Sequence, residues 1–149
     1  MIVDAQQLDI PQLQKMLEQE TFEIDTVLKT KGYLLLEKEV DSTTTTLYYN
    51  HVQQNANGPS WVRSLTMMEV NRGDVQSRLI KYRTYNKEEY LQLNTFLLYN
   101  NYKTKGKFDF GNEEHVLYTN GKSEIRIKTI QNKLQDGRLL KSYEFEVGK

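Results

Sequence analysis

The stretch that decides the fold is "LKTKGYLLLEKEV", residues 28–40, because part of it returns later in the chain. Residues 29–32 read "KTKG", and residues 103–106 read "KTKG" again. A helix-like run precedes each copy. Gly32 suits the left-handed position that follows a helix, and Lys29 and Lys31 suit the negative end of a helix. We interpret KTKG as a helix end in both halves of the chain.

The run before each KTKG predicts one amphipathic helix. In the first half, Asp9 is the expected N-cap and Pro11 lies in the first turn. Apolar residues recur there at helical spacing, namely Leu13, Leu17, Ile24 and Leu28. In the second half, Asn86 is the expected N-cap, and Glu89 follows it with the spacing of a capping box.

Each helix is followed by sequence that predicts a four-stranded antiparallel meander. The expected strands are 33–40, 43–52, 61–70 and 76–85 in the first half, and 107–110, 113–120, 123–132 and a last strand within 133–147 in the second. Residues 53–60 read as a loop. Arg72-Gly73-Asp74 reads as a tight hairpin turn rather than an integrin-binding motif, and Asp136-Gly137 as a second turn.

Further matches occur in the same order along the two halves. "LYYN" at 47–50 matches "LYTN" at 117–120, Val62-Arg63 matches Ile125-Arg126, and "RLIK" at 78–81 matches "RLLK" at 138–141. The sequence therefore predicts an α+β fold made by duplication of one helix and a four-stranded antiparallel β-meander. We expect this fold to be a single domain over 1–149, with repeats at about 9–85 and 86–149. Helices are expected on one sheet face, which leaves the other face free.

Composition narrows the classes of function. The chain has 149 residues, 20 acidic and 20 basic side chains, and no cysteine. The balanced charge argues against a nucleic-acid partner, and the missing cysteines exclude disulfides and thiolate metal sites. No apolar run has the length of a membrane span. The first residues lack the pattern of a signal peptide, which predicts a cytoplasmic protein as the sequence is written, or a periplasmic one if a leader has been removed.

No catalytic pattern is present. The two histidines, His51 and His115, have no metal-type spacing, and their places near strand ends predict that both are solvated. Glu113, Glu114 and His115 are neighbours on a strand, so their side chains alternate between faces and do not converge. We expect no cofactor, no metal and no enzymatic activity.

A difference between the halves suggests a binding surface instead. Trp61, Arg63, Leu65 and Met67 align with Glu124, Arg126, Lys128 and Ile130 when Val62-Arg63 is placed on Ile125-Arg126. The second set looks solvated, so the first set is expected to form an exposed aromatic and apolar sheet face; the alternative is that it belongs to the core. Tyr48, Tyr82 and Arg83 would extend this face, since Tyr, Trp and Arg are enriched at binding hot spots.

A tandem helix-plus-meander chain rich in tyrosine resembles the β-lactamase-inhibitor proteins in layout, over residues 12–149. The "LKTKGY" and "WVR" stretches also resemble small toxin-immunity proteins of Bacteroidetes-type bacteria. The resemblance implies a non-enzymatic protein that covers a partner, such as a toxin or an enzyme, with its sheet face. The alternatives are a small-ligand-binding domain of the cystatin-like α+β kind, with a cavity lined by Tyr90, Phe96, Tyr99 and Tyr102, and a homodimeric structural domain.

Overall fold

The computed structural model describes residues 7–55 and 58–148, except for the side chains of 52–62. This part of the chain forms three α-helices and eight β-strands. The helices are α1 (Ile10–Met16), α2 (Thr21–Thr30) and α3 (Lys87–Tyr99). The strands are β1 (Leu34–Val40), β2 (Thr44–Asn55), β3 (Gly58–Arg72), β4 (Val75–Thr84), β5 (Lys103–Phe110), β6 (Glu113–Thr119), β7 (Glu124–Lys133) and β8 (Leu139–Gly148).

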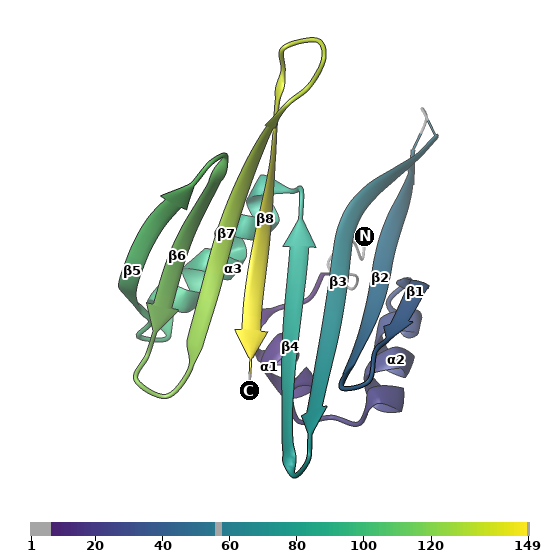
Figure 1. The fold of residues 1–149 in the computed structure, drawn as a ribbon. Helices are drawn as coiled ribbons and strands as arrows, with labels where there is room; N and C mark the ends of the chain where they lie inside the picture. The colour runs from purple at the N-terminus through teal and green to yellow at the C-terminus, as the bar shows by residue number, and fades with distance from the viewer. Residues whose placement is uncertain (1–6, 56–57, 149) are drawn as a thin grey trace. The chain divides into compact units, whose positions relative to one another are not determined.

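The strands form an eight-stranded antiparallel sheet in the order β1-β2-β3-β4-β8-β7-β6-β5, so β1 and β5 are its edge strands (Figure 1). The predicted α+β fold with two four-stranded meanders is confirmed. The chain divides into two compact units. The first contains Met1–Tyr82 together with Val147–Lys149, and the second contains Arg83–Glu146.

The first unit has two helices where the sequence predicted one. Asp9 caps α1 as expected, but α1 ends at Met16 and α2 begins only at Thr21. Arg78 on β4 donates hydrogen bonds from Nη1 to the carbonyl oxygens of Met16 and Gln19, each at 2.6 Å. The bond to Met16 satisfies a carbonyl group at the end of α1, where a helix leaves its last carbonyls without partners, and the bond to Gln19 holds the turn before α2. The prediction of one continuous helix is wrong because a side chain from a distant strand stabilises the break.

The first KTKG ends a helix as predicted. Gly32 has a φ of 92°, in the left-handed region that glycine adopts without steric cost. The amide of Tyr33 then donates to the carbonyl of Leu28 at 2.9 Å, which is the closing bond expected after a left-handed residue.

The second KTKG does not end a helix, so that prediction is wrong. Helix α3 ends at Tyr99, and Asn101 takes the left-handed position with a φ of 64°. The amide of Tyr102 donates to the carbonyl of Leu97 at 3.0 Å. The second KTKG lies within β5. Asparagine tolerates the left-handed conformation, so the same helix end forms without a glycine.

The two helix ends align the halves differently from the KTKG pair. Gly32 corresponds to Asn101 in backbone conformation, rather than to Gly106. The pairing of β1 with β2 shifts between Leu35 and Glu37, and the pairing of β5 with β6 shifts at the equivalent place, between Thr104 and Gly106. A β-bulge is a specific feature of a strand pair, so its recurrence in equal register supports the duplication.

The third strands also correspond in a different register from the predicted one. Tyr49 pairs with Leu65 in the first unit, and the equivalent Tyr118 pairs with Ile125 in the second. Leu65 therefore corresponds to Ile125 rather than to Lys128, and both Leu65 and Ile125 are fully buried. The pairing of β1, β2 and β3 in the first unit therefore follows the same register as the pairing of β5, β6 and β7 in the second.

Two other sequence predictions also need correction. Residues 53–60 were expected to form a loop, but β2 extends to Asn55 and pairs it with Gly58 at the start of β3. The stretches "RLIK" and "RLLK" are not equivalent, since 78–81 lies inside β4 while residue 138 precedes β8. Arg72-Gly73-Asp74 does link β3 to β4 as a tight turn, with Gly73 at a φ of 63°.

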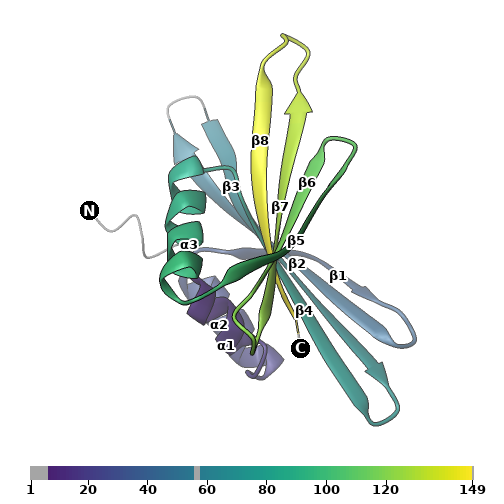
Figure 2. The ribbon, with the colours of Figure 1, turned by 90° about the vertical axis from the view of Figure 1, so that its left-hand side faces the viewer.

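In each unit the helices cover one face of the strands. The first core contains residues of α1 and α2, alternate residues of its strands, and Leu8 and Tyr33 beside the helices. Its members are Leu8, Ile10, Leu13, Met16, Ile24, Leu28, Tyr33, Leu47, Tyr49, Leu65, Met67, Ile80 and Tyr82. The second contains Leu93, Leu97, Tyr102, Ile125, Ile127, Tyr143 and Phe145. Figure 2 shows α3 on one side of its strands.

Candidate functional site

The third strand does not expose the apolar face that the sequence suggested. Leu65 is 0% exposed and Met67 1%, and Arg63 is also buried. Leu65 pairs with Tyr49 and Met67 with Leu47, so these side chains lie on the helix-covered face. The expectation of exposure is wrong for these residues, because the side chains belong to the core.

The other predicted partner-binding residues lie in different environments. The side chain of Trp61 is outside the described part of the structure. Tyr82 is fully buried, and its hydroxyl accepts a hydrogen bond from the amide of Leu8 at 3.4 Å. Arg83 is the next residue on the strand and therefore points to the opposite face, where it pairs with Glu144 at 2.9 Å. The structure does not bring these residues together.

Tyr48 is the predicted residue that stays partly accessible on the helix-free face. Its hydroxyl donates to Oε2 of Glu39 on β1 at 3.3 Å. Tyr48 pairs with Thr66 on one side and with Glu37 on the other. It therefore connects the helix-free face of the first unit to the edge strand β1.

The prediction that both histidines are solvated is wrong. His51 is 3% exposed, its ring centre lies 5.4 Å from that of Tyr33, and its Nδ1 lies 3.3 Å from Nη1 of Arg63. His115 stacks on Phe108 with ring centres 4.6 Å apart, and its Nε2 lies 3.7 Å from Glu113. His51 therefore belongs to a polar cluster inside the first core. His115 lies on the second unit, where it contacts Phe108 and Glu113.

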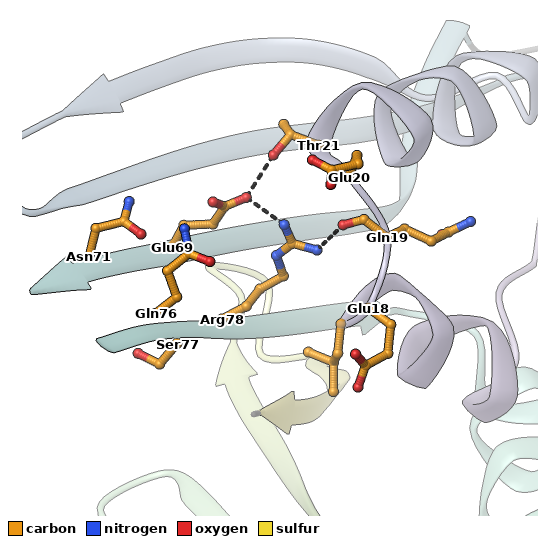
Figure 3. Close-up of a pocket in the computed structure, with 10 residues that line it drawn as sticks. Glu18, Gln19, Glu20, Thr21, Glu69, Asn71, Gln76, Ser77 and Arg78 are labelled. Atoms are coloured by element: carbon orange, nitrogen blue, oxygen red, sulfur yellow. Dashed lines mark hydrogen bonds and ion pairs between the residues drawn. The ribbon is translucent and has the colours of Figure 1, made fainter. Parts of the chain in front are cut away.

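A polar pocket of about 310 Å³ lies beside the turn between α1 and α2 (Figure 3). Arg78 makes most of its hydrogen bonds: Nη2 donates to Oε1 of Glu69 at 2.8 Å, while Nη1 donates to the carbonyls of Met16 and Gln19. The hydroxyl of Thr21 donates to the same carboxylate oxygen at 2.7 Å. The charges of Arg78 and Glu69 compensate each other within the first unit. The network therefore stabilises the turn between α1 and α2, which is a structural role.

Edge strand β1 is the most unusual exposed feature of the first unit. All seven of its residues are exposed. Leu34, Leu35, Leu36 and Val40 have exposed fractions of 61%, 40%, 54% and 69%. Among the described residues, β1 pairs on one side, with β2, so its other side presents free backbone donors and acceptors.

The duplicated edge strand β5 provides an internal comparison. When the helix ends and bulges of the two units are aligned, Lys103 and Lys105 take the places of Leu34 and Leu36. Lys105 also forms an ion pair with Glu124. Lysine on an edge strand opposes the addition of another strand. The positions of Leu34 and Leu36 are thus apolar on β1 and basic on β5, although β1 also carries Lys38 and β5 exposes Phe108 and Phe110.

A cavity of about 210 Å³ opens beside β1, on the helix-covered side. Lys38 of β1 and Thr21 of α2 line it, and the buried side chains of Leu47 and Met67 also contribute to its walls. A strand added beside β1 would direct alternate side chains toward this side of the sheet. The cavity could accept one of them, as the pockets beside other peptide-binding sheet edges do.

The sequence contains a signal for this exposed edge strand. Three consecutive leucines, Leu34 to Leu36, do not alternate with polar residues as a half-buried strand should. The lysines of the second half are the equivalents of these leucines only in the register of the strand pairing. The identical KTKG pair had aligned these strands in the wrong register.

Neither metal-binding groups nor similarity to known proteins assigns a function to these sites. Among the described residues, no group of three or more His, Asp or Glu could hold a metal ion. No helix in the same part of the chain is long and apolar enough to cross a membrane. Comparison of the chain with protein families, with curated proteins and with solved structures finds no match.

Proposed function

We propose that the protein is a non-enzymatic binding module that takes up an extended segment of another protein beside β1. The observation that supports this is the contrast between the two edges, with Leu34 and Leu36 on β1 where β5 carries Lys103 and Lys105. In strand addition, main-chain hydrogen bonds supply affinity and side-chain pockets supply specificity. A partner whose active-site rim or loop forms that segment would be inhibited, which is the role of an inhibitor or immunity-type protein.

The chemistry of β1 specifies the segment. Leu35, Lys38 and Val40 are paired with helix-facing residues of β2, whereas Glu37 and Glu39 are paired with residues of the helix-free face. A complementary strand therefore carries apolar side chains opposite the leucines and a basic side chain opposite the glutamates. One of its side chains would enter the cavity beside Lys38.

A displayed library of random eight-residue peptides tests this proposal. We expect enriched peptides with alternating apolar residues and a basic residue, which slow amide hydrogen exchange in β1. The double variant Leu34→Lys/Leu36→Lys copies the edge chemistry of β5 and is expected to fold while weakening binding about tenfold or more. The matched control is Lys103→Gln/Lys105→Gln in β5, which should leave binding unchanged.

Two results would overturn the proposal. One is that no peptide is enriched above the background of the double variant. The other is that enriched peptides protect amides elsewhere and bind both proteins equally. A second copy of the chain is the competing occupant of the same edge. Light scattering that shows a dimer, lost in the Leu34→Lys/Leu36→Lys variant, would replace the hetero-partner with self-association.

A further inference from the structure

The two units open clefts at equivalent places. Glu69 and Asn71 line the cleft of the first unit, and their equivalents on the third strand of the second meander, Thr129 and Gln131, line a cleft of the second. The backbone supports this correspondence. The amide of Asn71 bonds the carbonyl of residue 43, and that of Gln131 bonds the carbonyl of residue 112. The cleft in the second unit is larger, at about 560 Å³.

The contents of the two clefts differ. In the first, Arg78 is held by Glu69 and by the carbonyls at the end of α1 and in the turn that follows, so the cleft contains its own ion pair. In the second, Thr129 replaces Glu69 and cannot form that pair. Lys141 lines this cleft, and it makes no ion pair or hydrogen bond with another described residue. The second cleft therefore has, among its described residues, no equivalent of the ion pair between Arg78 and Glu69.

One end of the second cleft is basic and aromatic. Tyr90 of α3 stacks on Tyr143 of β8, with ring centres 4.1 Å apart. Lys87 precedes Tyr90 by three residues on the helix, and Lys141 precedes Tyr143 by two on the strand, so each lysine shares a face with its tyrosine. Both lysines line the cleft. Lys87, like Lys141, has no charged partner among the described residues, so two cationic groups are available beside an aromatic surface.

The other end of the cleft is acidic. Asp109 and Glu114 are paired residues of β5 and β6, and both line the cleft. Glu114 lies 3.8 Å from Lys107 in a loose ion pair, and Asp109 has no ion pair with a described residue. Burial, and then the neighbouring Tyr118, Tyr143 and Glu114, raise the pKa of Tyr90. The phenol therefore stays neutral and presents its ring rather than a charge.

We propose that this cleft binds a dipolar ligand, with an anionic group between Lys87 and Lys141 and an organic cation between Asp109 and Glu114. The two ends lie on β8 and β5, which are three strand spacings apart, or about 14 Å. An extended peptide rises about 3.4 Å per residue, so a peptide of about four residues with free termini spans the cleft. The volume of the cleft falls within the range that is typical of small-molecule sites.

Tetra-alanine with free termini is the probe, titrated into the full chain and followed by amide NMR shifts. We expect shifts at Tyr90, Thr129 and Tyr143. Acetylation of the amino terminus or amidation of the carboxyl terminus should each weaken binding about tenfold. Lys141→Gln should abolish the effect of amidation, and Asp109→Asn the effect of acetylation. Lys122→Gln, an exposed change outside the cleft, is the control that should preserve both effects.

Three outcomes would overturn the inference. Free and doubly capped tetra-alanine could bind equally, which would show that charge at the ends is not recognised. The shifts could lie outside the cleft. No shift could appear up to the solubility limit of the peptide. Lys141 and Asp109 are exposed, so loss of folding does not confuse these results, and none of them depends on the proposed role of β1.

Discussion

Replacement of Leu65 with alanine discriminates directly between a buried and an exposed third strand. Leu65 is 0% exposed and lies on the helix-covered face beside Tyr49 and Met67. Truncation of a fully buried leucine removes its transfer free energy and leaves a cavity, and together these cost about 3–5 kcal/mol. For a chain of this size, a loss of about 3 kcal/mol corresponds to a fall in Tm of roughly 6–12 °C.

Urea denaturation followed by tyrosine fluorescence measures this loss. Leu36→Ala is the matched control, because it makes the same chemical change at a leucine that is 54% exposed. The control should alter the free energy of unfolding by about 0.5 kcal/mol or less. If Leu65→Ala costs no more than Leu36→Ala, the strand is not packed as described, and the exposed face suggested by the sequence returns.

Two further predictions concern helix ends and pH. Gly32→Ala should lower the free energy of unfolding by about 1–2 kcal/mol, because φ is 92° there, whereas Asn101→Gly should change it little; thermal melts compare the two. The Lys29 ammonium, and then the Tyr49 hydroxyl, hold the pKa of Asp25 below its ordinary value. This stabilisation is present above the ordinary carboxyl pKa and is lost as pH falls through the folded pKa. Tyr49→Phe should therefore reduce the loss of stability between neutral and acid pH in denaturation series, and an unchanged pH slope would refute this coupling.

Local chemistry was predictable where one residue decides the backbone. Asp9 caps its helix, Gly32 ends one, and Gly73 makes a hairpin turn, all as the sequence indicated. Each of these signals acts within a few residues, so neighbouring sequence contains the whole cause. The number of strands in each meander followed from the same kind of evidence.

Features that depend on distant residues were not predictable. The break between α1 and α2 is stabilised by Arg78, which lies far along the chain on β4. The second helix end uses Asn101 without a glycine, so the identical KTKG pair aligned the halves incorrectly. Backbone conformation is preserved between the units where residue identity is not.

The burial of the third strand was ambiguous for a different reason. Leu65 and Met67 alternate with Met68 and Val70, so both faces of this strand carry apolar side chains. A period of two residues then fails to identify the inner face. Only the pairing of Leu65 with Tyr49 beneath the helices resolves it.

The division of β8 between the two units has a consequence for synthesis on the ribosome. Val147 and Gly148 belong to the first unit, although the whole of the second unit precedes them in the chain. At about 5–20 residues per second, they emerge roughly 3–13 s after residue 82. During that interval the first unit lacks residues that complete it, so its folding cannot finish before the second unit has been synthesised.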